Sequence, residues 1–143
     1  MNVPPFDRVT ASTDVVEVML PLEHRHASTV RVVAAALGAD AGFDVDEIDD
    51  LRLGVDEAVA AIVAASPGHS ANGSGAAAAR LVLHFETEPG AVTVRATRTP
   101  PIPLTRSDVD GLALRILEAV SDRFDVVDGA LVLTKRAATH DGD

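Results

Sequence analysis

One long amphipathic pattern constrains the fold of this chain more than any other feature. From Val45 to about Ala65, apolar residues recur at intervals of three and four positions, which predicts a single long helix. The residues of this apolar stripe are Ile48, Leu51, Val55, Val59 and Ile62. A second stripe, which includes Glu57 and Ala61, faces away from the first. The helix is therefore expected to lie with its apolar side on another layer of structure.

Shorter patterns predict the elements that surround this helix. In chain order they are a strand over 15–20, a helix over 27–37 with Gly38 as its C-terminal cap, a hairpin over 81–97 and a hairpin over 123–136. The two hairpins turn at Pro89-Gly90 and at Asp128-Gly129, both strong turn signals.

A third helix is expected between the two hairpins, after a proline-rich stretch over 98–108 that is too irregular for a helix or strand. Ser107 or Asp108 would cap it. Its apolar stripe consists of Val109, Leu112, Ile116 and Val120. The whole order predicts an α+β fold, a two-layer sandwich whose mostly antiparallel sheet is covered on one face by about three helices.

The length of 143 residues fits one compact domain. We expect a flexible leader over 1–13, a single domain over 14–137 and a disordered tail over 138–143. The segment 66–78 is rich in Ser, Gly and Ala, which predicts a mobile loop.

Composition narrows the classes of function. The net charge of -10 disfavours direct binding to nucleic acid but permits a basic protein partner. The absence of cysteine fits a reducing compartment, and no apolar run has the length of a membrane span. We therefore expect a cytoplasmic protein that is not associated with a membrane. The five histidines lack the spacing of a metal site, so no metal is expected.

The segment 49–63, DDLRLGVDEAVAAIV, resembles the N box of the GHKL (histidine-kinase-like) ATPase fold. In that box a Glu activates a water or a substrate hydroxyl, and an Asn four residues later holds the magnesium of bound ATP. Within the superfamily the chain is most similar to anti-sigma factors of the RsbW and SpoIIAB type, which are also serine-protein kinases. The resemblance covers roughly residues 15–136 and implies the two-layer fold of that family.

The N box itself departs from the family pattern at one position. The resemblance places Glu57 at the catalytic Glu, but Ala61 stands where the Asn should be. A methyl group cannot coordinate Mg²⁺, which takes oxygen ligands. From residue type and spacing alone, Glu57 either points into a cleft or is an ordinary solvated side chain.

The remaining nucleotide motifs are also altered. The adenine-binding Asp-x-Gly-x-Gly motif is missing, with Ala96 or Thr97 at the Asp position and prolines in place of the glycines. This stretch is also explained as a structural crossover without a ligand. The glycine-rich turn before the last helix retains Gly111 alone, and the family's Gly-Thr pair appears as Gly129-Ala130. Glu57 and Gly111 are the candidate nucleotide-binding residues that remain.

The resemblance also indicates a partner surface on the first helix. It aligns Arg25 and Arg31 with arginines near the face that the family uses for the sigma factor and its antagonist. Arg31 lies off the apolar stripe, so its guanidinium is free to reach a partner carboxylate. The alternative for each residue is an ordinary solubilising arginine.

Three functional hypotheses follow. The first is an anti-sigma factor-like regulator that sequesters an alternative sigma factor, is countered by an anti-anti-sigma antagonist, and binds ATP weakly or not at all. The second is an active serine-protein kinase that uses Glu57 as general base and Mg-ATP as cofactor to phosphorylate that antagonist. The third is a structural or dimerisation domain, since the family commonly forms homodimers and the strand over 15–20 suits a sheet edge.

Overall fold

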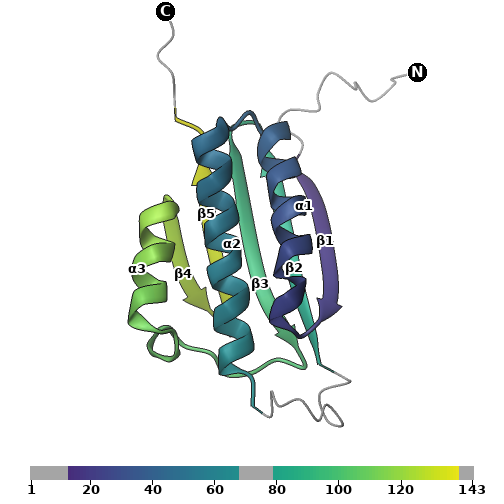
Figure 1. Ribbon diagram of the computed structural model, residues 1–143, viewed down its shortest axis with the longest axis vertical. Coiled ribbons are helices and arrows are strands. Elements are labelled where there is room, and N and C mark those ends of the chain that lie inside the picture. The colour runs from purple at the N-terminus through teal and green to yellow at the C-terminus, as the bar shows by residue number, and fades with distance from the viewer. Residues whose placement is uncertain (1–12, 68–78, 139–143) are drawn as a thin grey trace, which may run out of the picture.

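The computed structural model describes residues 13–67 and 79–138, and these form a two-layer α+β sandwich (Figure 1). The strands are β1 (Asp14–Pro21), β2 (Arg80–Glu88), β3 (Ala91–Thr99), β4 (Arg123–Val127) and β5 (Ala130–Arg136). The helices are α1 (Ala27–Asp40), α2 (Val45–Ala65) and α3 (Gly111–Val120), with short 3-10 turns η2 (His24–His26) and η4 (Arg106–Asp108). The predicted fold class is confirmed.

All neighbouring strands of the sheet are antiparallel, in the order β1-β2-β3-β5-β4. Both predicted hairpins form. Gly90 has a φ of +82°, and Asp128 and Gly129 have φ of +51° and +77°, a left-handed pair typical of tight hairpin turns. The strand predicted near the N-terminus is the edge strand β1.

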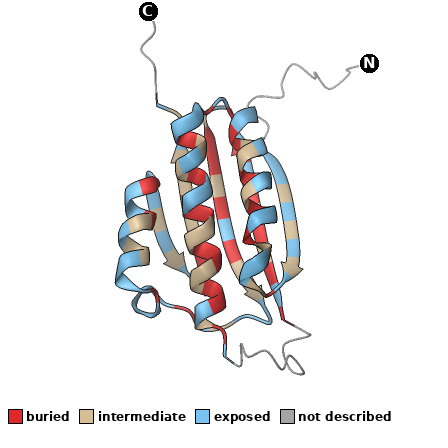
Figure 2. Ribbon diagram, in the orientation of Figure 1, coloured by how far each residue is buried: buried red, intermediate tan, exposed pale blue. Residues whose placement is uncertain are grey.

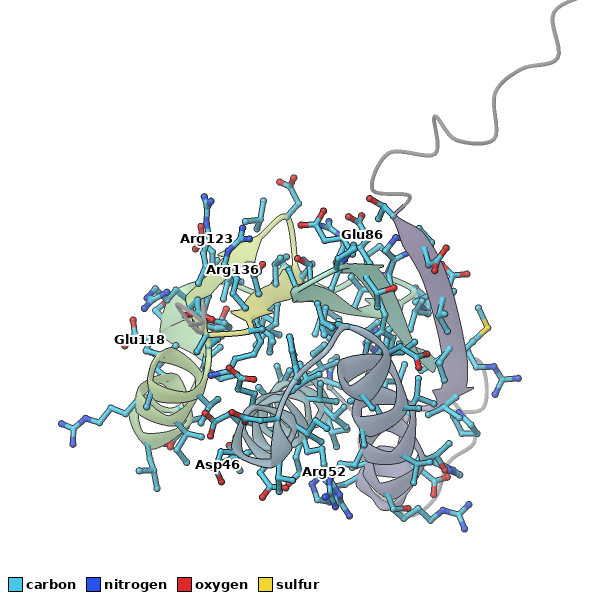
Figure 3. All side chains as sticks on the ribbon, turned by 90° about the horizontal axis from the view of Figure 1, so that it is seen from above. Asp46, Arg52, Glu86, Glu118, Arg123 and Arg136 are labelled. Atoms are coloured by element: carbon cyan, nitrogen blue, oxygen red, sulfur yellow. The ribbon has the colours of Figure 1, made fainter. Side chains whose placement is uncertain are left out.

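The core lies between the sheet and the helices (Figure 2). Alternate residues of the central strands, such as Leu83 and Phe85 on β2 and Val94 on β3, are fully buried beneath α1 and α2. The other face of the sheet carries polar and charged side chains. Figure 3 shows Glu86, Arg123 and Arg136 on that open face, opposite the helices.

Helix α2 has the bounds that the sequence predicts, and a capping box stabilises its first turn. The Asp44 side chain accepts a hydrogen bond from the Glu47 N–H, and the Glu47 carboxylate accepts one from the Asp44 N–H, both at 2.8 Å. Such a capping box satisfies two amide groups that a helix leaves unpaired. The Glu47 carboxylate also accepts a hydrogen bond from the Ala138 N–H, so it connects the segment just after β5 to the start of α2.

The prediction that Gly38 caps α1 is wrong. Gly38 lies inside the helix and is buried, where an added Cβ would come within 3.1 Å of the Phe43 ring. The helix continues to Asp40, and Gly42 supplies the left-handed residue with a φ of +93°. The Phe43 N–H donates to the Gly38 carbonyl and the Gly42 N–H to the Ala39 carbonyl, the pair of bonds that defines a Schellman motif.

The prediction for the start of α3 is also wrong. Thr105 is the N-cap of the short turn η4, and Asp108, the last residue of that turn, accepts hydrogen bonds from the N–H and the hydroxyl of Thr105. Val109 is extended, so the helix cannot run on from this turn, and Asp110 is the N-cap of α3. The buried residues of α3 are Leu117 and Val120. Leu112, predicted for the core, is 65% exposed.

The expected leader over 1–13 and tail over 138–143 fall almost entirely outside the described residues, as does most of the expected loop over 66–78. The division into one domain over 14–137 stays a prediction. In the part of the chain that the structure describes, no helix combines the length and the apolar character needed to cross a bilayer.

Candidate functional site

A cavity of about 500 Å³ lies between the C-terminal half of α2 and the start of α3. From α2 it is lined by Glu57 and by three alanines, Ala60, Ala61 and Ala64. From the other side it is lined by Asp108, Asp110, Leu112, Ala113 and Ile116. The structure therefore places the predicted catalytic Glu57 in a cleft. Leu112 is exposed because it lies, with Ile116, on the side of α3 that borders this cavity.

Glu57 sits in an unfavourable environment for a negative charge. Partial burial raises the pKa of its carboxyl above the ordinary value of 4.5, and the carboxylates of Asp56 and Asp110 raise it further. Only His24 acts in the opposite direction. Within residues 13–67 and 79–138, no side chain forms an ion pair with Glu57.

The neighbouring acidic residues of α2 are paired. Asp56 accepts a hydrogen bond from the guanidinium of Arg31 at 2.7 Å, and Asp50 from Lys135 Nζ at 3.1 Å. Glu57, in contrast to Asp50 and Asp56, lines the cavity without an ion-pair partner among the described residues.

The cavity does not fit Mg-ATP, the cofactor implied by the resemblance. Ala61 offers no oxygen to a magnesium ion. The N-terminus of α3, a position that often binds phosphate, is occupied by its own cap, because Asp110 accepts hydrogen bonds from the N–H groups of Leu112 and Ala113 at 3.0 and 3.4 Å. Of the described residues that line the cavity, none is basic and three are acidic.

Gly111 shows no sign of a special role at this helix start. An added Cβ would meet no atom within 4 Å, so neither packing nor its φ requires glycine there. Arg106 lies in the adjacent turn η4 but is already engaged. Its guanidinium pairs with Glu118 and lies 5.4 Å from the centre of the Phe124 ring.

A second cavity, of about 350 Å³, adjoins the first and shares Asp108 with it. Its lining is otherwise apolar, formed by Ala65, Pro67, Ile102, Pro103 and Leu104. The proline-rich stretch thus forms a wall at the position where the resemblance places a flexible glycine loop. We call the two cavities together the α2–α3 groove.

The two candidate partner-binding arginines lie in different environments. Arg25 is on η2, with its side chain 72% exposed and paired with Glu23. Arg31 is on α1 and its side chain is only 36% exposed, because it bridges to Asp56 on α2. Arg31 is therefore already engaged within the fold, and its role in partner binding stays a prediction. A partner carboxylate would have to compete with Asp56 for it.

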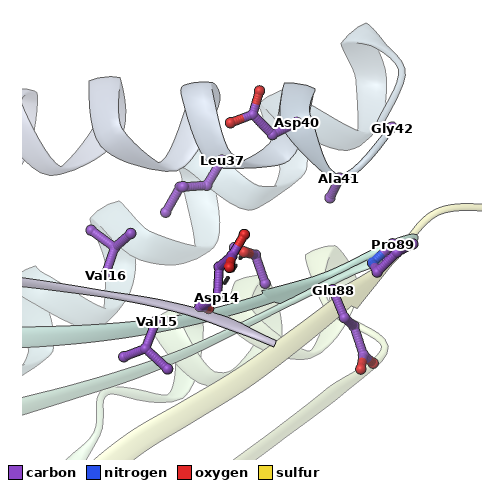
Figure 4. A pocket seen from close by; sticks show the side chains of 10 residues that line it. Asp14, Val15, Val16, Leu37, Asp40, Ala41, Gly42, Glu88 and Pro89 are labelled. Atoms are coloured by element: carbon purple, nitrogen blue, oxygen red, sulfur yellow. Dashed lines mark hydrogen bonds between the residues drawn. The ribbon is translucent and has the colours of Figure 1, made fainter. Parts of the chain in front are cut away.

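A third cavity, of about 630 Å³, lies between the C-terminus of α1 and the β1–β2 edge (Figure 4). Asp14, Asp40 and Glu88 are among its lining residues, but the Glu88 side chain points away from Asp40. Among the described residues, no group of three or more His, Asp or Glu side chains is arranged to hold a metal ion.

Comparison with solved structures identifies the fold. A crystal structure of the RsbU and RsbW domains of a protein from Mycobacterium tuberculosis matches with a TM-score of 0.60 and 20% sequence identity. The match covers 87% of this chain and 32% of that chain, so this chain spans about a third of its length. No family model and no curated protein matches the chain. The chain has an RsbW-like fold of the GHKL type.

Sequence reasoning identified Glu57 and Ala61 but missed the opposite wall of the groove. The sequence indicates Asp108 only as a possible cap of the third helix, it does not single out Asp110, and it assigns Leu112 to the apolar stripe of that helix. The signal that was available is the Thr105-x-x-Asp108 spacing, which resembles a capping box and separates a short turn from α3. The Arg31–Asp56 bridge joins residues 25 positions apart, and no local pattern reveals such a pair.

Proposed function

We propose that this protein is an anti-sigma factor-like regulator, which sequesters an alternative sigma factor by protein–protein binding and is released by an anti-anti-sigma antagonist. One observation carries the proposal: an RsbW-like fold retains its scaffold, while the groove beside Glu57 presents carboxylates and methyl groups instead of ligands for Mg-ATP. Sequestration requires a complementary surface and no catalytic centre. ATP binding is accordingly weak or absent.

The face around η2 and the start of α1 is the proposed contact surface for the partner. Arg25 is exposed there, and Arg31 is held nearby by Asp56. Arginine recognises carboxylates through two parallel hydrogen bonds and is frequent among the residues that dominate binding energies. Both arginines are proposed to pair with acidic groups on the sigma factor or on the antagonist.

The test is affinity capture from the native cytosol, with proteins identified by mass spectrometry, followed by calorimetry with the purified partner. We expect a sigma factor to be captured equally well with and without Mg-ATP. Arg25→Ala should weaken its affinity about tenfold, the loss typical of an interface residue worth more than 1 kcal/mol. Arg123→Ala, which removes the same charge from the opposite face of the sheet (Figure 3), is the matched control. Recovery of the bait alone would contradict the proposal.

An active serine-protein kinase is the second candidate, favoured by one specific observation. Glu57 lines a cavity and its pKa is raised, as suits a general base that works near neutral pH. This candidate requires nucleotide binding. Calorimetric titration with Mg-ATP separates the two functions, because micromolar binding, together with phosphate transfer that Glu57→Ala abolishes, would establish the kinase and overturn the first proposal.

The protein is further proposed to form a homodimer through β1. This strand is a sheet edge on which Val15 and Met19 are more than half exposed, and unpaired edges readily join a second strand. Light scattering after size-exclusion chromatography tests this directly. A monomer at every accessible concentration would refute it.

A further inference from the structure

We propose that the α2–α3 groove binds a basic side chain, Lys or Arg, from a protein partner, with an aliphatic neighbour of that residue in the adjoining apolar cavity. The inference rests on the proposed function in one respect, because it takes the ligand to be a protein. It adds a second contact surface, and it assigns a ligand to a groove whose resemblance to a nucleotide site would suggest an anion.

The charges of the groove select a cation. Three carboxylates, those of Glu57, Asp108 and Asp110, line the first cavity, and no Lys or Arg among the described residues lies with them. Asp108 accepts hydrogen bonds from Thr105, and Asp110 accepts them from the first N–H groups of α3. Neither carboxylate has an ion-pair partner among the described residues. Glu57 has no ion-pair partner in the described part of the chain, so its carboxylate is available to a guanidinium or ammonium group.

The walls of the groove fit the rest of a basic side chain. Lys and Arg carry a long aliphatic stem that packs on apolar surface while the charged end stays near water. The alanines of α2 provide a smooth wall for such a stem, and Leu112, 65% exposed, forms its rim on α3. Leu112 therefore adds apolar surface at the edge of the cavity, on which the stem of a bound side chain can pack.

The second cavity extends the groove toward an apolar contact. It begins at the shared Asp108 and is walled by Ile102, Pro103 and Leu104. A segment that placed a cation beside Glu57 could therefore place an aliphatic side chain against this wall. An acidic or phosphorylated segment would instead meet three carboxylates, and desolvating like charges together is costly.

The test uses two acetylated and amidated tripeptides, Leu-Arg-Leu and its neutral analogue with citrulline in place of arginine. Each is titrated into the full chain while NMR follows the amides and methyls of Ala61, Leu112 and Ala113. The arginine peptide should shift these signals and bind about fivefold more tightly than the citrulline peptide, the factor expected for a partly exposed ion pair. Higher salt should reduce the difference.

The variant Glu57→Gln should reduce the preference for arginine, with the remainder due to Asp108 and Asp110, while Glu88→Gln, the same change at a distant site, should leave the preference intact. Equal affinity for the two peptides, no shifts at these residues up to the solubility limit, or tighter binding of Mg-ATP at the same residues would each overturn the inference.

The outcome is separable from that of the proposed function. Arginine-selective binding without capture of any sigma factor would uphold the groove and refute the regulator. Capture of a sigma factor together with failure of the peptide titration would do the reverse.

Discussion

Glu47 and Asp50 near the start of α2 differ from Glu57 further along the helix in what their carboxylates contact. Near the start of the helix, Glu47 accepts hydrogen bonds from two backbone N–H groups, and Asp50 pairs with Lys135 of β5. About two helical turns beyond Asp50, Glu57 faces a cavity beside other carboxylates and has no ion-pair partner among the described residues. Glu47 and Asp50 connect α2 to other elements, whereas Glu57 is left available to a ligand. The following substitutions test this contrast.

The largest loss is expected for Glu47→Ala. The change removes a nearly buried acceptor and leaves the N–H groups of Asp44 and Ala138 without their partner. It should lower the free energy of unfolding by about 2 kcal/mol. Urea denaturation measures this, and Asp46→Ala, an exposed acidic residue in the same turn, should cost only about 0.5 kcal/mol. Equal losses would remove the distinction between the two residues.

Asp50→Ala is expected to have the next largest effect. Lys135 is only 14% exposed, and the substitution leaves its ammonium without the partner at 3.1 Å. A loss of about 1 to 2 kcal/mol in unfolding free energy follows from stranding a nearly buried charge. The control is Asp49→Ala, whose partner Arg52 is well exposed and 3.5 Å away. That change should cost less than about 0.5 kcal/mol.

The Arg31–Asp56 bridge is expected to contribute less to stability than the Asp50–Lys135 pair. A double-mutant cycle measures its contribution. Both side chains are partly exposed, so we expect a coupling energy of about 0.5 kcal/mol between Arg31→Ala and Asp56→Ala. If the bridge competes with a partner for Arg31, Asp56→Ala should also strengthen binding to that partner. A coupling energy of zero would show that the bridge to Asp56 does not restrain Arg31.

The smallest effect, and one of opposite sign, is expected for Glu57→Gln. An acid whose pKa is raised on folding destabilises the native state when it is ionised, and this cost is present above the raised pKa and absent well below 4.5. The variant should therefore melt slightly above the wild type at pH 7. The difference should vanish as the pH falls below 4.5. A lower melting temperature at pH 7 would show that Glu57 contributes to the fold like Glu47.

Local patterns predicted the elements of this fold well. The stripe from Ile48 to Ile62 gave the bounds of α2, and Asp128-Gly129 gave the second hairpin, because periodicity and turn chemistry act over a few residues. The predictions were wrong where a contact between distant residues determines the local structure. Gly38 looks like a cap in the sequence, but it is a glycine because Phe43 packs against it.

The candidate site was predictable on one side only. Glu57 and Ala61 share a stripe on α2, and the N-box resemblance singles them out. The other wall depends on where α3 begins, which is set by an extended Val109 and the cap at Asp110. The pairing of Arg31 with Asp56 depends on how α1 lies against α2, which the sequence of neither helix specifies.

The turn at Gly129 has a consequence for the evolution of this groove. A Cβ at this position would stand 2.7 Å from the Ile102 carbonyl oxygen, so any other residue would force the proline-bearing wall and the β4–β5 hairpin apart. The width of the second cavity, which Ile102 lines, therefore depends on the residue at this distant turn. Homologues with a bulkier residue there should differ in ligand preference even if every lining side chain is unchanged.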